Sequence, residues 1–141
     1  MPREELFIVS KVYPHHASRE GVAEACERSL ARLGLGHLDL YLLHWPGSHP
    51  LRETVAGFEL LRERGLIRRW GVSNFDTAQM TALWKAPHGD RCAANQIYLS
   101  LTQRGAEFEL LPQMRRLGVP AMAYSPIDQG VLLKNTKIGD V

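Results

Sequence analysis

The chain has 141 residues, a formal net charge of +2 and a hydrophobic fraction of 45%. That length corresponds to one globular domain or less, and a charge imbalance this small gives no reason to expect a nucleic-acid or anionic-membrane partner. No apolar run approaches the roughly 20 residues that are needed to span a bilayer.

The two cysteines are predicted to be small core residues. Cys26 falls on the apolar stripe of a predicted helix, and Cys92 begins a predicted strand. They form no CxxC pair, and no signal peptide opens the chain. This cysteine usage favours a reducing compartment, so we expect the protein in the cytoplasm.

Strand-forming and helix-forming segments alternate from the first residues onward. Residues 6–10 form the first predicted strand, and a helix follows from an N-cap at Ser18 to Gly34. Residues 38–43 read as a buried strand. This strand stops at Pro46, which cannot donate a hydrogen bond to a neighbouring strand.

The second half of the chain continues the same alternation. The sequence Asp76-x-x-Gln79 is a capping box, which predicts the start of a helix. The other predicted elements are, in chain order, a helix over 51–64, a strand over 67–72, a strand over 93–97, a helix over 110–117 and a strand over 119–124.

This alternation predicts parallel strands with helices outside them. A complete (β/α)8 barrel takes about 250 residues for its eight units, so this chain corresponds to about four and a half units. The prediction is an α/β fold, a partial (β/α)8 TIM barrel with about five parallel βα units. A five-stranded doubly wound sheet is the alternative, but no glycine-rich phosphate loop follows the first strand.

Polar or aromatic residues occur at the carboxyl end of every predicted strand. In a parallel arrangement these ends meet at one rim, so the residues are expected to share a site. A cation, an imidazole, amide groups and an aromatic face together suit the chemistry of a carbonyl group. In strand order they are Lys11, His44, Ser73 with Asn74, Gln96, and Tyr124 with Ser125.

Five blocks of the sequence resemble consecutive blocks of the aldo-keto reductases: "FIVSKVYP", "RLGLGHLDLYLLHWPG", "RGLIRRWGVSNF", "ANQIYLSLTQRGAEFELLP" and "VPAMAYSPIDQG". They follow the family order and are most similar to bacterial members that reduce small aldehydes such as methylglyoxal. The resemblance implies that residues 1–141 are the central portion of a single barrel domain, carrying the family's strands three to seven. It also implies NAD(P)H-dependent reduction of a small aldehyde or ketone, usually with NADPH, although NAD is not excluded.

The resemblance also assigns catalytic and substrate-binding residues. The family uses an aspartate, a tyrosine, a lysine and a histidine, and the last two match Lys11 and His44. In this assignment His44 orients the substrate carbonyl, and Lys11 lowers the pKa of the tyrosine that donates the proton. Tyr13 and Trp45 match positions that line the substrate pocket.

Five further residues match the cofactor site of the family. Ser73, Asn74 and Gln96 match the residues that hold the nicotinamide carboxamide. Tyr124 matches the aromatic residue that stacks on the nicotinamide ring, and Ser125 begins the loop that faces the pyrophosphate. No metal is expected, because His15 and His16 have no acidic or cysteine partner at ligand spacing.

The sequence also departs from the family pattern. The family's aspartate and tyrosine precede the lysine block in a motif like "DTAxxYGNE", which this sequence does not contain. The family's eighth strand and its adenosine-phosphate segment would follow Val141. In "NQIYLSL" the tyrosine stands one place earlier than is usual. We therefore expect the 141-residue chain to be inactive as a reductase by itself.

A second hypothesis is a non-catalytic remnant of a reductase that acts as a self-associating scaffold. Five strands of a barrel leave unpaired edges at residues 6–10 and 119–124, together with an uncovered interior, and such surfaces favour association with another chain. A smaller prediction concerns the arginines at 62, 64, 68 and 69. Because Glu59 and Glu63 lie among them, the run is predicted to be a solvated helix end.

Overall fold

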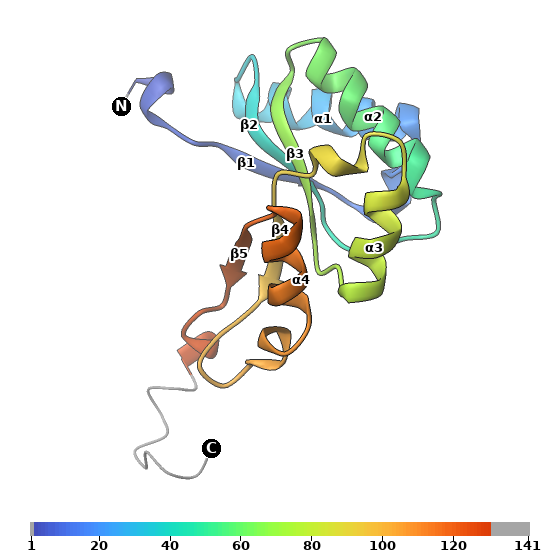
Figure 1. Ribbon diagram of the computed structural model, residues 1–141. Helices are drawn as coiled ribbons and strands as arrows, with labels where there is room; N and C mark the ends of the chain where they lie inside the picture. Colours follow the sequence, from blue (N-terminus) through green and yellow to red (C-terminus); the bar gives the residue numbers. More distant parts are fainter. Residues whose placement is uncertain (1, 131–141) are drawn as a thin grey trace.

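The computed structural model describes residues 2–130, which form one five-stranded sheet in the order β1-β2-β3-β4-β5 (Figure 1). All four strand pairs are parallel. The strands are β1 (Val9–Val12), β2 (Leu38–Leu43), β3 (Ile67–Ser73), β4 (Asn95–Tyr98) and β5 (Ala121–Tyr124). The helices between them are α1 (Arg19–Leu33), α2 (Leu51–Glu63), α3 (Thr77–Lys85) and α4 (Leu110–Leu117). The predicted fold class, five parallel βα units, is confirmed.

The helix ends follow the capping signals of the sequence. The Ser18 hydroxyl accepts a hydrogen bond from the backbone N–H of Gly21 (3.1 Å) and begins α1. Gly34, with φ of 66°, ends that helix in the left-handed conformation that glycine adopts most readily. At the start of α3, Asp76 and Gln79 form both hydrogen bonds of the capping box.

The first strand begins later than predicted: β1 covers Val9–Val12 rather than residues 6–10. The reason is that the backbone N–H of Ile8 donates to the carboxylate of Asp39 (2.8 Å) instead of to a backbone carbonyl. β1 also ends later than predicted, at Val12, so Lys11 lies inside the strand and pairs with Leu42 of β2.

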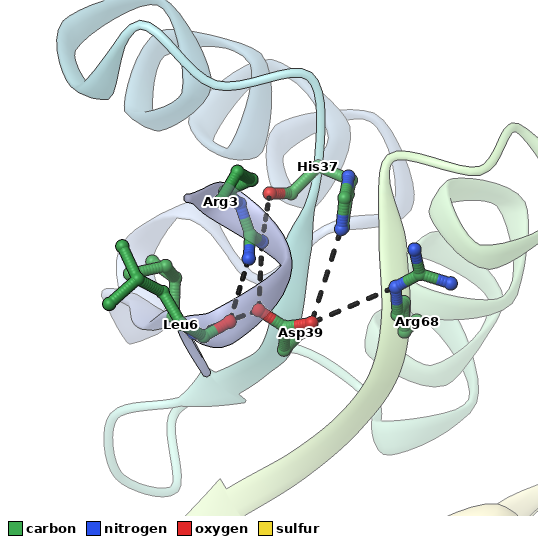
Figure 2. A network of polar contacts seen from close by, with 6 residues as sticks. Arg3, Leu6, His37, Asp39 and Arg68 are labelled. Carbon is green, nitrogen blue, oxygen red and sulfur yellow. Dashed lines mark hydrogen bonds and ion pairs between the residues drawn. The ribbon is translucent and has the colours of Figure 1, made fainter. Parts of the chain in front are cut away.

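Asp39 anchors the segment that leads into β1 (Figure 2). Its carboxylate also accepts a hydrogen bond from the guanidinium of Arg3 (2.8 Å), and the imidazole of His37 and the guanidinium of Arg68 lie 4.0 and 3.7 Å away. The hydrogen bond from Ile8 lowers the pKa of Asp39, and Arg3 lowers it further against the opposing effect of burial. The carboxylate therefore stays ionised and fixes β1 against β2.

The main core lies between the sheet and the helices. Figure 1 shows α1 and α2 together over one side of the first three strands, with α4 beside β4. At the centre of this core, Phe58 of α2 stacks on Trp70 of β3, with the ring centroids 5.3 Å apart, and meets Tyr41 of β2 edge-on. All three side chains are fully buried.

The arginines at 62, 64, 68 and 69 are all exposed, as predicted for a solvated helix end, but Glu59 beside them is only 6% exposed. Its carboxylate accepts hydrogen bonds from the indole N–H of Trp70 (2.7 Å), from Arg62 (2.7 Å) and from Arg91 (2.5 Å). Burial raises the pKa of Glu59, but the bonds from Trp70 and Arg91 and the charges of Arg62 and Arg91 outweigh it and leave the pKa below its usual value. The network ties α2 to β3 and to the segment that precedes β4.

The inner face of the sheet, away from the helices, is less open than predicted. Leu40, Leu42 and Ala94 are buried there at 3%, 0% and 3% exposure. Val9 of β1 and Met122 of β5 each pack against this small cluster, so part of the inner face is covered. The expectation of an uncovered interior is therefore wrong for this part of the sheet.

The prediction for the cysteines is confirmed, since Cys26 and Cys92 are both buried. Burial raises the pKa of each thiol to about 12, which leaves both uncharged and unreactive. Among residues 2–130, no helix has the length and apolar character needed to cross a membrane.

Candidate active site

A cavity of about 300 Å³ lies at the carboxyl ends of the strands and collects residues from all five of them. Six residues line it: Lys11, His44, Ser73, Asn74, Gln96 and Tyr124. The first and fifth of these lie within their strands, and the others end a strand or directly follow one. The parallel register explains their meeting, because Ser73 pairs with Gln96 and each strand ends at the same edge.

His44 directly follows β2, and a backbone hydrogen bond to β1 fixes its position. Its N–H donates to the carbonyl of Val12 (2.9 Å), which continues the pairing of β1 and β2 by one residue. Burial lowers the pKa of the imidazole, and the positive charge of Lys11 lowers it further. The ring is therefore neutral at pH 7, with one nitrogen able to donate a hydrogen bond and the other able to accept one.

Asn74 connects the second, third and fifth strands. It has a positive φ of 60°, a conformation that asparagine tolerates better than most residues. Its side-chain N–H groups donate to the carbonyl of His44 (3.1 Å) and to the hydroxyl of Ser73 (3.2 Å). Its side-chain oxygen accepts a hydrogen bond from the hydroxyl of Tyr124 (2.8 Å).

Gln96 supplies both a fixed carbonyl and an unoccupied side chain. Its backbone carbonyl accepts hydrogen bonds from the hydroxyl of Ser73 (2.9 Å) and from the N–H of Asn74 (2.8 Å). Its half-buried side-chain amide makes no hydrogen bond to any other group in residues 2–130. An amide in this position can bind a ligand that has both a donor and an acceptor.

An aromatic wall stands beside the imidazole. The ring of Tyr13 stacks on His44 with centroids 5.3 Å apart, and meets the ring of Trp45 edge-on at 5.4 Å. Tyr13 is 51% exposed and Trp45 is 42% exposed, so the wall faces open space. Ser125, with φ of 51°, follows Tyr124 but does not line the cavity.

Tyr98 is a neighbour of the site that sequence reasoning missed. It pairs with Tyr124 across β4 and β5, and the two rings stack with centroids 5.3 Å apart. The unusual place of the tyrosine in "NQIYLSL" was the available signal. A larger cavity, of about 430 Å³, lies beyond Asn74 toward α3 and α4, but it has no lysine or histidine in its lining. The smaller cavity is therefore the candidate site.

Comparison with known proteins identifies clear relatives. The sequence profile described as "Aldo/keto reductase family" matches residues 1–141. The chain is 52% identical over 133 residues to methylglyoxal reductase YeaE of Escherichia coli K12, covering 94% of this chain and 47% of that protein. It is 41% identical over 135 residues to glyoxal reductase of Bacillus subtilis 168, again with 94% and 47% coverage.

Solved structures agree with these matches. An aldo/keto reductase of Klebsiella pneumoniae in complex with NADP and acetate superposes with a TM-score of 0.91 at 49% identity, covering 94% of this chain and 47% of that one. An aldo-keto reductase of Bombyx mori in complex with NADP gives a TM-score of 0.82 at 34% identity, with 99% and 47% coverage. The chain thus spans about half the length of the relatives it matches.

Proposed function

The chain belongs to the aldo/keto reductase family, and on this premise we propose that it carries the lysine, the histidine and the nicotinamide-binding residues of an NADPH-dependent reductase of small aldehydes and ketones. The observation that carries the proposal is that six residues from five strands line one cavity. The names of two relatives, methylglyoxal reductase and glyoxal reductase, support a small aldehyde as substrate. We also propose that the protein acts in the cytoplasm, where its buried thiols stay reduced.

The residues present fit a nicotinamide ring and its carboxamide. Gln96 offers an amide without a partner among residues 2–130, and Ser73 and Asn74 lie beside it. Tyr124 offers an aromatic face against which the ring would stack, and Ser125 would face the pyrophosphate. The reduced cofactor, NADPH or less usually NADH, would supply the hydride.

His44 and Lys11 would act on the substrate oxygen. The neutral imidazole of His44 would donate a hydrogen bond to the carbonyl oxygen and orient it, because an uncharged ring at this position keeps its N–H at pH 7. Lys11 would lower the pKa of a proton-donating tyrosine. Tyr13 and Trp45 would form the apolar wall of the substrate pocket.

The 141-residue polypeptide by itself is expected to reduce no aldehyde at a meaningful rate. No residue in it matches the family's aspartate or its tyrosine, and general acid catalysis alone contributes about 10²–10⁴-fold. The assay is oxidation of NADPH in the presence of methylglyoxal. Turnover of about 1 per second that disappears in Lys11→Met would contradict this expectation.

NADPH should bind the polypeptide only weakly, at about the millimolar level that corresponds to roughly −4 kcal/mol. Ring stacking and a few amide hydrogen bonds contribute about 0.5–1.5 kcal/mol each. A fluorescence titration should show weaker binding still in Tyr124→Ala and no change in Phe108→Ala, a control whose ring is 84% exposed. Equal affinity in the wild type and in Tyr124→Ala would reject the role of Tyr124.

Self-association as a non-catalytic scaffold is the second candidate. In the sheet of residues 2–130, β1 and β5 each pair with one neighbour only. A groove of about 410 Å³ also lies between α4 and the start of β5, and its lining includes Leu111, Met114 and Val119. Light scattering tests this candidate: a monomer whose mass does not rise with concentration would exclude it.

A further inference from the structure

Asp128 fastens the segment that follows β5 to the segment that follows β4. One oxygen of its carboxylate accepts a hydrogen bond from the hydroxyl of Tyr98, and the other accepts one from the hydroxyl of Thr102 (2.7 Å). The backbone N–H of Asp128 donates to the carbonyl of Ser125 (2.8 Å), which turns the chain back immediately after the strand. The carboxylate is thus held by two residues of one neighbouring segment.

Tyr98 in turn lies against the ring of Tyr124. The two planes are inclined by only 13°, and the residues are direct neighbours in the register of β4 and β5. The hydroxyl of Tyr124 is held separately by Asn74. The ring of Tyr124 is therefore fixed at one face by Tyr98 and at its far end by the amide.

These contacts matter because β5 has little other support. None of its four residues is buried, and β4 is its only partner strand in residues 2–130. A tyrosine at the end of such a strand would otherwise be free to change rotamer. The stack with Tyr98 restrains one face of the ring, and Asp128 restrains Tyr98.

The place of Tyr98 in the sequence makes this arrangement possible. Side chains alternate between the two faces of a strand, so Tyr98, the last residue of β4, shares its face with Gln96 and is paired with Tyr124 of β5. The hydrogen bond to Asp128 raises the pKa of Tyr98, and the bonds from Tyr98 and then Thr102 lower the pKa of Asp128, so donor and acceptor both keep the required ionisation states near pH 7.

We propose that Asp128 and Tyr98 are positioning residues, which hold the ring of Tyr124 in the orientation that a nicotinamide ring needs. This inference rests on the proposed role of Tyr124 as the stacking surface. Neither residue is expected to touch the reacting atoms. Tyr98 acts through its stack on Tyr124, and Asp128 acts through its hydrogen bond with the Tyr98 hydroxyl.

The test uses the full chain labelled with 3-fluorotyrosine and observed by fluorine NMR. The chain has four tyrosines, so each signal can be assigned from a Tyr→Phe variant. Asp128→Asn and Tyr98→Phe are mild changes, and the second keeps the stacked ring while it removes the hydroxyl. Asp128→Asn should shift the signals of both Tyr98 and Tyr124, and Tyr98→Phe should shift that of Tyr124. Asp90→Asn, an exposed control, should shift neither.

A titration with NADPH then tests whether the position of the Tyr124 ring affects the binding of the cofactor. It should shift the Tyr124 signal of the wild type, and each variant should require an about threefold to tenfold higher concentration for half of that shift. The two effects should not add in the double variant, because Asp128→Asn removes the charge of the acceptor and Tyr98→Phe removes the donor of the same hydrogen bond. A Tyr124 signal that stays unmoved in Asp128→Asn would overturn the positioning role. If NADPH does not shift the wild-type Tyr124 signal, the stacking role of Tyr124 fails instead, and the cofactor-free spectra still decide the positioning claim.

Discussion

The central strands β2 and β3 and the edge strand β5 differ in how much of each strand the rest of the molecule buries. All six residues of β2 are buried, whereas none of the four residues of β5 is. β2 and β3 are paired at five positions, but β3 and β4 at only two. The candidate site draws on strands of both kinds. His44 directly follows the fully buried β2, and Tyr124 ends β5. Lys11 and Gln96 lie in β1 and β4, which are partly buried.

Under the proposed function, this difference would separate two tasks within the site. His44, which would meet the reacting carbonyl, directly follows the buried strand β2, and a group in that role needs a fixed position. Tyr124, which would bind the cofactor, ends β5, and elements of lower local stability open more readily. The hydrogen bonds from Tyr98 and Thr102 to Asp128 would then support Tyr124 where β5 lacks burial.

The largest expected difference in the free energy of unfolding is between alanine variants of two phenylalanines, Phe58 in α2 and Phe108 in the segment before α4. Phe58→Ala empties a position that is 1% exposed and stacked on Trp70, and should lower the free energy of unfolding by about 3–5 kcal/mol. Phe108→Ala removes a ring that is 84% exposed, and should change it by less than about 0.5 kcal/mol. Urea unfolding of both variants measures the contrast, and similar losses in the two would contradict it.

A smaller loss of stability is expected from a substitution between β3 and β4, which are paired at only two positions. The side chain of Asn95 is fully buried, donates to the carbonyl of Phe75 (2.9 Å) and accepts from its N–H (3.4 Å). Asn95→Ala leaves both backbone groups buried without these partners, at a cost of about 1–3 kcal/mol. Hydrogen exchange should quicken in β4, β5 and α4 and stay unchanged in β2. Equal acceleration in β2 would mean that the sheet opens as one unit.

The smallest effect depends on pH and concerns the anchor of β1. The pKa of Asp39 is lowered in the folded state, so its stabilising contribution is complete above the unfolded value of about 3.9 and is lost as the pH falls through the lower, folded value. The wild type should therefore be more stable than Asp39→Asn at pH 6, and this advantage should shrink below about pH 4. Thermal unfolding of both proteins from pH 6 to pH 2 measures it. A constant advantage over that range would show that the ionised carboxylate is not the anchor.

Local sequence signals predicted most of the fold. The strand at Leu38–Leu43 and the helix at Leu110–Leu117 have the predicted bounds, because an apolar run closed by breakers and a terminal glycine are sufficient signals. The start of β1 was wrong, since it depends on the Asp39 carboxylate, which lies 31 positions from Ile8 in the sequence. No local pattern reports such a contact.

The sequence predicted those residues of the candidate site that lie near the carboxyl ends of the strands. Six of the residues named from strand ends and family blocks line one cavity, which follows from the parallel register. The burial of Glu59 was missed because its partners Trp70 and Arg91 lie on other elements. The stack of Tyr98 on Tyr124 was missed because it needs the alignment of β4 with β5.

The central claim is that Lys11 belongs to the active site of an aldehyde reductase, and a chimaeric enzyme tests it most directly. Residues 3–130 of this chain would replace the matching segment of the Escherichia coli relative, with which it shares 52% identity. The chimaera should reduce methylglyoxal with NADPH, Lys11→Met should lower its kcat by at least about 10²-fold, and Lys85→Met, at the exposed end of α3, should not change it. An active chimaera that keeps its full kcat in Lys11→Met would contradict the account.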